Sequence, residues 1–135
     1  MAIRLRCKIE LAVSSSSAEE RDLGNAKYEI VVDSQNEGGS WKTVLVGGAS
    51  DVQLQLPNIA DARFLAIRTT AKDPTQDPDE ISIKINGTGN EARKITPMSG
   101  SKEGFYLSTT DGLTSVHASH AGTVDMELIV FAAGD

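Results

Sequence analysis

The sequence predicts an all-β fold, an antiparallel β-sandwich of jelly-roll-like type with nine to ten short strands. Apolar and polar residues alternate with a period of two in many short runs, and turn residues separate these runs. No stretch shows the 3.6-residue period of an amphipathic helix. A length of 135 residues suits one domain, so we expect a single β-sandwich domain over residues 1–135.

The first run, residues 3–13, alternates with few faults and predicts a half-buried antiparallel strand. It is long for a globular strand, and long strands at a chain end often pair with a neighbour or form a sheet edge. One face would carry Ile3, Leu5, Cys7, Ile9, Leu11 and Val13, and the other Arg4, Arg6, Lys8 and Glu10. Residues 14–25 are polar without a period and predict an exposed, flexible loop, with one helical turn at 18–23.

Nine further strands are expected along the chain. They cover residues 27–33, 41–48, 51–57, 62–70, 81–87, 92–98, 104–110, 113–119 and 123–133. Residues 62–70 are apolar in their middle, which predicts a strand covered on both faces. In the last strand Val124, Met126, Leu128 and Val130 are expected to face inward. Because both ends of the chain are strands, the first and last are candidates to lie side by side.

The stretch "ISIKINGTGNEARKI", residues 81–95, predicts a β-hairpin. Its first half alternates strictly, and the break falls at Asn86-Gly87, two residue types that accept the positive φ of tight hairpin turns. The linking stretch "NGTGNE" is longer than two residues, so we expect a bulged or longer loop.

Charge and composition exclude several classes of function. The formal net charge is -6, from 13 basic and 19 acidic residues, and an acidic surface repels the phosphates of nucleic acid. No apolar run approaches the roughly 20 residues of a membrane helix, and the first residues lack the apolar core of a signal peptide. Cys7 is the one cysteine, which excludes an intrachain disulfide and favours a buried free thiol.

No catalytic, cofactor or metal constellation emerges from the sequence, so we expect no enzyme. His117 and His120 lie three apart, which on a strand places them on opposite faces, and we expect both at the surface or in turns. The stretch "DPTQDPDE", residues 73–80, lacks the spacing of an EF-hand. It predicts a solvated acidic turn, with a Ca²⁺ site as the alternative.

Four residues are the candidate partner-binding residues. Arg4, Arg6 and Lys8 form the one basic cluster on a net-acidic chain. They make either a solvated strand face or a contact with an acidic partner. Trp41, at a strand start, either packs at the rim of the core or anchors a partner. One Trp, two Tyr and three Phe leave few aromatics for a flat sugar-binding platform.

The second half of the chain resembles small structural proteins of tailed-bacteriophage virions. The likeness lies in an ordered series over roughly residues 62–135, formed by "FLAIRT", "ISIKING", "GFYLSTTDGLTSVHAS" and "VDMELIVFAAG". The chain departs from this pattern in the longer acidic insert between "RTT" and "ISIKI". It departs again in the histidines of "SVHASH", where such chains often carry Asn or Ser.

This resemblance implies a jelly-roll or related β-sandwich protein that decorates and cements a phage head by binding its outer surface. A tail or baseplate protein is the alternative within the same family. A carbohydrate- or ligand-binding module is the alternative outside it, and would show an exposed aromatic row or an ordered Ca²⁺. The implied partners are the major capsid protein, other virion proteins and further copies of the chain, with a homotrimer preferred. The implied location is the virion exterior, after synthesis in the host cytoplasm.

Overall fold

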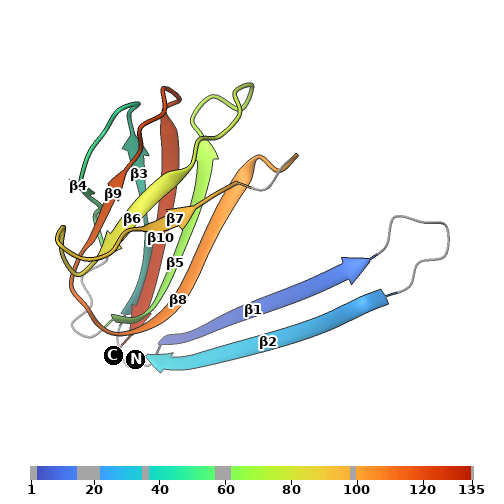
Figure 1. Ribbon diagram of the computed structural model, residues 1–135. Helices are drawn as coiled ribbons and strands as arrows, with labels where there is room; N and C mark the ends of the chain where they lie inside the picture. The colour runs from blue at the N-terminus through green and yellow to red at the C-terminus, as the bar shows by residue number, and fades with distance from the viewer. Residues whose placement is uncertain (1–2, 15–21, 35–36, 57–61, 98–99, 135) are drawn as a thin grey trace.

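A computed structural model describes the backbone of residues 3–14, 22–34, 37–56, 62–97 and 100–134, and the side chains of 39–56, 62–97 and 100–134. These residues form an all-β structure in which every strand pairing is antiparallel (Figure 1). The strands are β1 (Ile3–Ser14), β2 (Asp22–Ser34), β3 (Glu37–Leu45), β4 (Val52–Gln53), β5 (Ala62–Ala71), β6 (Ile81–Ile85), β7 (Arg93–Ile95), β8 (Glu103–Leu113), β9 (Val116–Ser119) and β10 (Met126–Gly134). The predicted all-β class is confirmed.

Eight of these strands form two sheets that share one hydrophobic core. The sheet orders are β3-β10-β5-β8 and β4-β9-β6-β7. The chain changes sheet at every step from β3 to β6 and again from β7 to β10, while β6 and β7 are neighbours in one sheet. The inward residues of both sheets, among them Leu65, Ile83, Val116 and Leu128, join in a single buried cluster. We call residues 37–134 the two-sheet body.

Strand β10 runs through the middle of its sheet, between β3 and β5. Its Met126, Leu128 and Val130 are buried, as the alternation predicts, and Val124 packs against the same core. The first and last strands, the candidates to lie side by side, are not neighbours in a sheet. The described partner of β1 is β2, in a continuous antiparallel register from Ile3 opposite Ser34 to Val13 opposite Gly24.

Strands β1 and β2 form a two-stranded hairpin that belongs to neither sheet of the body. Figure 1 shows it leaving the foot of the body, where both chain ends lie, and extending to one side. The body contacts it through β10 against β2 and β3 against β1. The loop predicted at 14–25 is wrong at both ends, because Ser14 still pairs with Asp22; the remainder, 15–21, lies outside the described residues.

The hairpin predicted at residues 81–95 is confirmed. Strands β6 and β7 pair with Ile81 opposite Ile95. Asn86 and Gly87 have φ values of 61° and 139°, so both take the positive φ that their identity suggests. The longer loop is closed by Asn90, whose Nδ2 donates to the Ile85 carbonyl at 2.8 Å.

The side chain of Asn86 ties this hairpin to the connection between β8 and β9. Its Oδ1 accepts hydrogen bonds from Thr114 N at 2.7 Å, Thr114 Oγ1 at 3.2 Å and Ser115 N at 3.4 Å. Its Nδ2 donates to the Gly112 carbonyl at 3.0 Å, and its backbone N–H donates to the Ser115 carbonyl at 2.8 Å. Since β8 and β9 belong to different sheets, one asparagine fixes the corner at which the chain passes between them.

Candidate functional site

The candidate site is the outer face of the β3-β10-β5-β8 sheet, the face turned away from the core. Directly paired residues of antiparallel strands lie on the same face. The registers therefore place four rows of residues across this outer face. The rows are Glu103–Thr70–Glu127–Val44, Phe105–Arg68–Ile129–Lys42, Leu107–Ala66–Phe131–Ser40 and Thr109–Phe64–Ala133–Gly38.

Part of the outer face is apolar, whereas the solvent-facing side of an antiparallel sheet is usually polar. Phe105 is 62% exposed and Leu107 47% exposed, on the edge strand β8. Beside them Ile129 and Phe131 are half-buried, and Phe64 is buried with its ring edge-on to Phe131 at a centroid distance of 6.2 Å. We call the contiguous set formed by Phe64, Ala66, Phe105, Leu107, Ile129 and Phe131 the apolar strip.

A charged border adjoins the apolar strip, and its Arg68 stands between Phe105 and Ile129 in one row. Glu103 pairs with Arg68, and Glu127 pairs with Lys42 at 2.9 Å. Both ion pairs are substantially exposed, so each contributes little to stability. Their effect is local. The four charges pair with one another, so none of them is left unpaired next to the strip.

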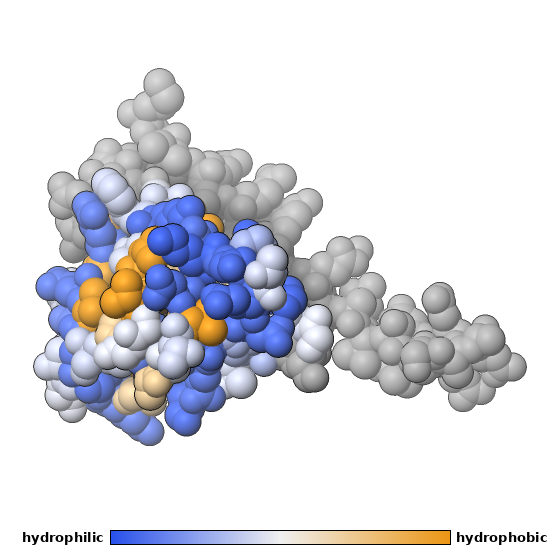
Figure 2. All heavy atoms as spheres, turned by 90° about the horizontal axis from the view of Figure 1, so that it is seen from above, coloured by the Kyte–Doolittle hydropathy of each residue, from blue (hydrophilic) through white to orange (hydrophobic). Residues whose placement is uncertain are grey.

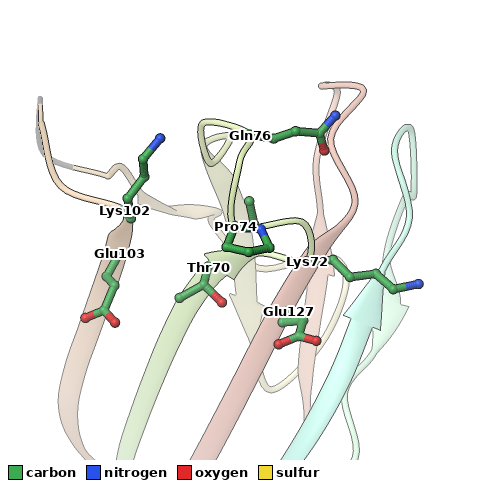
Figure 3. Close-up of a pocket in the computed structure, with 8 residues that line it drawn as sticks. Thr70, Lys72, Pro74, Gln76, Lys102, Glu103 and Glu127 are labelled. Atoms are coloured by element: carbon green, nitrogen blue, oxygen red, sulfur yellow. The ribbon is translucent and has the colours of Figure 1, made fainter.

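An open hollow of about 400 Å³ adjoins the charged border, lined by Thr70, Ala71, Lys72, Pro74, Gln76, Lys102, Glu103 and Glu127. Figure 3 shows Glu103, Thr70 and Glu127 side by side on three neighbouring strands, with Lys102 and Lys72 extending outward from opposite sides. Both carboxylates already have a cationic partner in the outer face. Figure 2, seen from above, shows that this end of the body is mainly hydrophilic. The hollow is therefore bordered by charged side chains, and both of its carboxylates are already paired.

Trp41, the one predicted partner-binding residue whose side chain is described, does not belong to the apolar strip. It pairs with the buried Val130 and so lies on the core side of the edge strand β3, 43% exposed. This is the rim position that the sequence offered as one of two possibilities. The backbone of Arg4, Arg6 and Lys8 lies in β1, but their side chains, like that of Cys7, lie outside the described part of the chain.

The carboxylates of the acidic stretch 73–80 do not converge on one point. Asp73 accepts hydrogen bonds from Thr75 N at 2.9 Å and Thr75 Oγ1 at 2.7 Å, and Asp79 accepts one from Val124 N at 3.0 Å. Asp77 pairs with Lys102, while Glu80 pairs with Lys94 at 2.9 Å and accepts from Thr96 at 2.8 Å. Across the described side chains there is no group of three or more potential metal ligands.

These contacts lower the pKa of three carboxyl groups. The Thr75 backbone N–H holds the pKa of Asp73 below its ordinary value of 3.8, and hydrogen bonding to Lys102 does the same for Asp77. The Lys94 ammonium, followed by the Thr96 hydroxyl, lowers the pKa of Glu80 from its ordinary 4.5. Each group favours its ionised form in the folded state, so the unfolded chain takes up protons first on acidification.

We expect the thermal midpoint to fall as the pH drops below the ordinary values of 4.5 and 3.8, and to go on falling until these groups are protonated in the folded state as well. The combined variant Asp77→Asn with Glu80→Gln should have a lower midpoint at pH 7 and a smaller fall between pH 5 and pH 3. Thermal denaturation followed by circular dichroism measures both. The control is Glu91→Gln, at an exposed acid of the β6–β7 loop. A variant as acid-sensitive as the unmodified chain would contradict the assignment.

His120 lies in the connection after β9, outside the strands, but its side chain is buried, so of the two expected positions the surface one is wrong for this residue. Its side chain is 0% exposed, with Nδ1 at 3.9 Å from Asp79 Oδ2, and among the described residues neither ring nitrogen has a hydrogen-bond partner. The acidic stretch covers it, because Asp79 is held over the end of β9 by Val124 N. No local pattern reveals this cover, because it depends on contacts between residues more than 40 positions apart.

The apolar strip is the feature that the sequence reasoning missed. A signal for it is present, since residues 62–70 are apolar at successive positions, which predicts a strand covered on both faces.

Within the described residues no helix has the length and apolarity to cross a membrane. Comparison of the chain with protein-family models, with curated proteins and with solved structures found no match.

Proposed function

We propose that the chain is a structural protein of a virion, a capsid decoration or cement protein that stabilises a phage head by binding its outer surface. The observation that carries the proposal is the apolar strip, a contiguous apolar surface with Phe105 and Leu107 exposed, which favours a protein that acts by assembling with other chains. Apolar patches of this kind mark interaction sites in soluble proteins. On this proposal the chain acts through contact area and is not an enzyme.

We also propose that the two-sheet body is a jelly-roll β-sandwich. The sheet orders β3-β10-β5-β8 and β4-β9-β6-β7 support it, because consecutive strands change sheet at nearly every step. Jelly rolls occur in viral capsid proteins and also in lectins. The likeness of residues 62–135 to phage structural proteins favours the first. Trp41 and Phe105 lie at opposite edges of their sheet and on opposite faces, which does not favour an aromatic sugar platform.

The proposed mechanism is stabilisation by binding. A protein that binds the intact shell and not the disrupted one lowers the free energy of the intact shell, by about 4 kcal/mol per site at a thousandfold excess over the Kd. We propose a homotrimer on the particle, since cyclic symmetry lets identical patches be used where capsid subunits meet in threes. Arg4, Arg6 and Lys8 remain the proposed contact with an acidic shell surface, and Trp41 is a second candidate.

The test adds purified protein to undecorated particles and measures the temperature at which DNA is released. We expect this temperature to rise with protein concentration and to level off when the sites are filled. An unchanged release temperature at saturating protein, or no binding, would remove the cement proposal and leave the tail and ligand-binding alternatives.

Charge reversal tests the basic contact separately. The variant Arg6→Glu with Lys8→Glu should bind particles more weakly than the unmodified protein, and binding of the unmodified protein should weaken as salt rises. The matched control is Lys72→Glu with Arg93→Glu, at two exposed cations of the body. Equal losses from both pairs would show that overall charge, and not the β1 cluster, governs attachment.

A further inference from the structure

We propose that the apolar strip of each chain receives the β1–β2 hairpin of a second copy, so that copies assemble by exchanging hairpins. The proposal goes beyond attachment to a shell, because it concerns contact between copies of this chain. It holds or fails whether or not the chain is a virion protein.

The register makes the β1–β2 hairpin an amphipathic ribbon. One face is built from apolar positions on both strands, with Leu5 opposite Val32, Cys7 opposite Ile30 and Ile9 opposite Tyr28. The other face pairs opposite charges, with Arg4 opposite Asp33 and Lys8 opposite Glu29. An isolated two-stranded hairpin is at best marginally stable in water, so its apolar face needs a cover.

The described contacts of the hairpin with its own body lie at β3 and β10, and Figure 1 shows the rest of it leading away from the foot. At about 3.4 Å per residue, a 12-residue strand is roughly 40 Å long, against roughly 30 Å for the nine residues of β10. The hairpin is therefore long enough to reach past its own body and cross the strip of a neighbour.

The two surfaces match in character, and the hairpin is the larger of the two. Strand spacing and rise give roughly 200 Å² for the six residues of the strip and roughly 400 Å² for the apolar face of the hairpin. Each chain would bury up to about 600 Å² of its own surface, at the lower end of the roughly 600–1,000 Å² per partner of a standard interface. A hairpin lying apolar side down would turn its charged face to water, next to the charged border formed by Arg68–Glu103 and Lys42–Glu127.

Exchange also gives every strip an occupant and every hairpin a cover. Each chain gives one hairpin and receives one. The assembly can therefore close as a twofold pair or as a threefold ring. The threefold ring is the arrangement that suits the proposed trimer.

A cysteine cross-link tests the occupant of the strip. Cys7 is the one cysteine of the chain and lies at an apolar position of the hairpin, so Leu107→Cys places a second thiol on the strip. Mild oxidation should link chains to one another, seen as multiples of 14.3 kDa on a non-reducing gel, with a peptide joining the segments around positions 7 and 107. Two control variants should form no link between chains. One combines Leu107→Cys with Cys7→Ser, and the other is Val46→Cys, at an exposed site off the strip. A link within one chain, or one that survives Cys7→Ser, would overturn the proposal.

Light scattering on the purified protein, without particles, tests the interface itself. The unmodified chain should be a closed oligomer at 100 µM, and Phe105→Asp with Leu107→Asp should reduce its mass to 14.3 kDa while the circular dichroism spectrum of the fold is kept. The matched Val46→Asp should stay oligomeric. A monomeric unmodified chain would overturn hairpin exchange and leave the DNA-release test of the proposed function unaffected.

Discussion

Replacing Asn86 with alanine should lower the free energy of unfolding by about 1–3 kcal/mol, since it removes the side-chain hydrogen bonds that hold an exposed corner of the chain. The N–H groups of Thr114 and Ser115 lose their acceptor, and the Gly112 carbonyl loses its donor. Alanine must also take the φ of 61°, which costs a non-glycine residue without a polar side chain about 1–2 kcal/mol.

Urea denaturation of the variant and the parent chain measures this effect. Asn86→Asp is the informative companion, because it keeps an acceptor for Thr114 and Ser115 and loses the donor to Gly112; its loss should be smaller. Asn90→Ala is the matched control, since its side chain makes a single hydrogen bond, to Ile85 O, in the same loop. An Asn86→Ala loss no larger than that of Asn90→Ala would show that the corner does not depend on this side chain.

Substituting Gly104 with alanine should cost about 1–3 kcal/mol through overpacking. A Cβ at this position would lie 2.6 Å from Thr69 Oγ1 and 2.9 Å from Ile95 Cγ2, both closer than real contacts allow. Gly104 is buried opposite Thr69 in the β5–β8 pairing, so the strands would have to separate to admit a methyl group.

The cause can be isolated by a double-mutant cycle. Thr69→Ala removes the nearest atom, and the combination with Gly104→Ala should cost less than the sum of the two single changes. Gly89→Ala is the control, since a Cβ there would meet nothing within 4 Å. Additive losses in the cycle would mean that Ile95, or the backbone itself, sets the limit.

The sequence predicts the strands well where local pattern decides them. The alternation in residues 124–130 and the Asn-Gly at 86–87 each determine a local geometry, and both predictions are confirmed. The boundary at 14–25 fails for a physical reason. Strand length there is extended by cross-strand pairing between Ser14 and Asp22, and polar residues pair their backbones as well as apolar ones.

The candidate site lies beyond what alternation can reveal. Phe105 and Leu107 alternate with Tyr106, so each face of the run carries a large apolar or aromatic side chain. The pattern alone does not say which face meets the core. The choice comes from the register, which sets Tyr106 opposite the buried Ile67 and leaves Phe105 and Leu107 outside. His120 is similar, since its burial depends on Asp79 and Val124 meeting above it.

The central place of β10 has a consequence during synthesis on the ribosome. Strand β3 finds its partner only after residues 126–134 have emerged, because Leu45 pairs with Met126. At 5–20 residues per second, the roughly 80 residues between them take about 4–16 s to translate. During that interval β3 and β5 lack the strand that separates them, and their edges are open to other nascent chains. A chaperone that shields strand edges during this interval should therefore raise the yield of native protein.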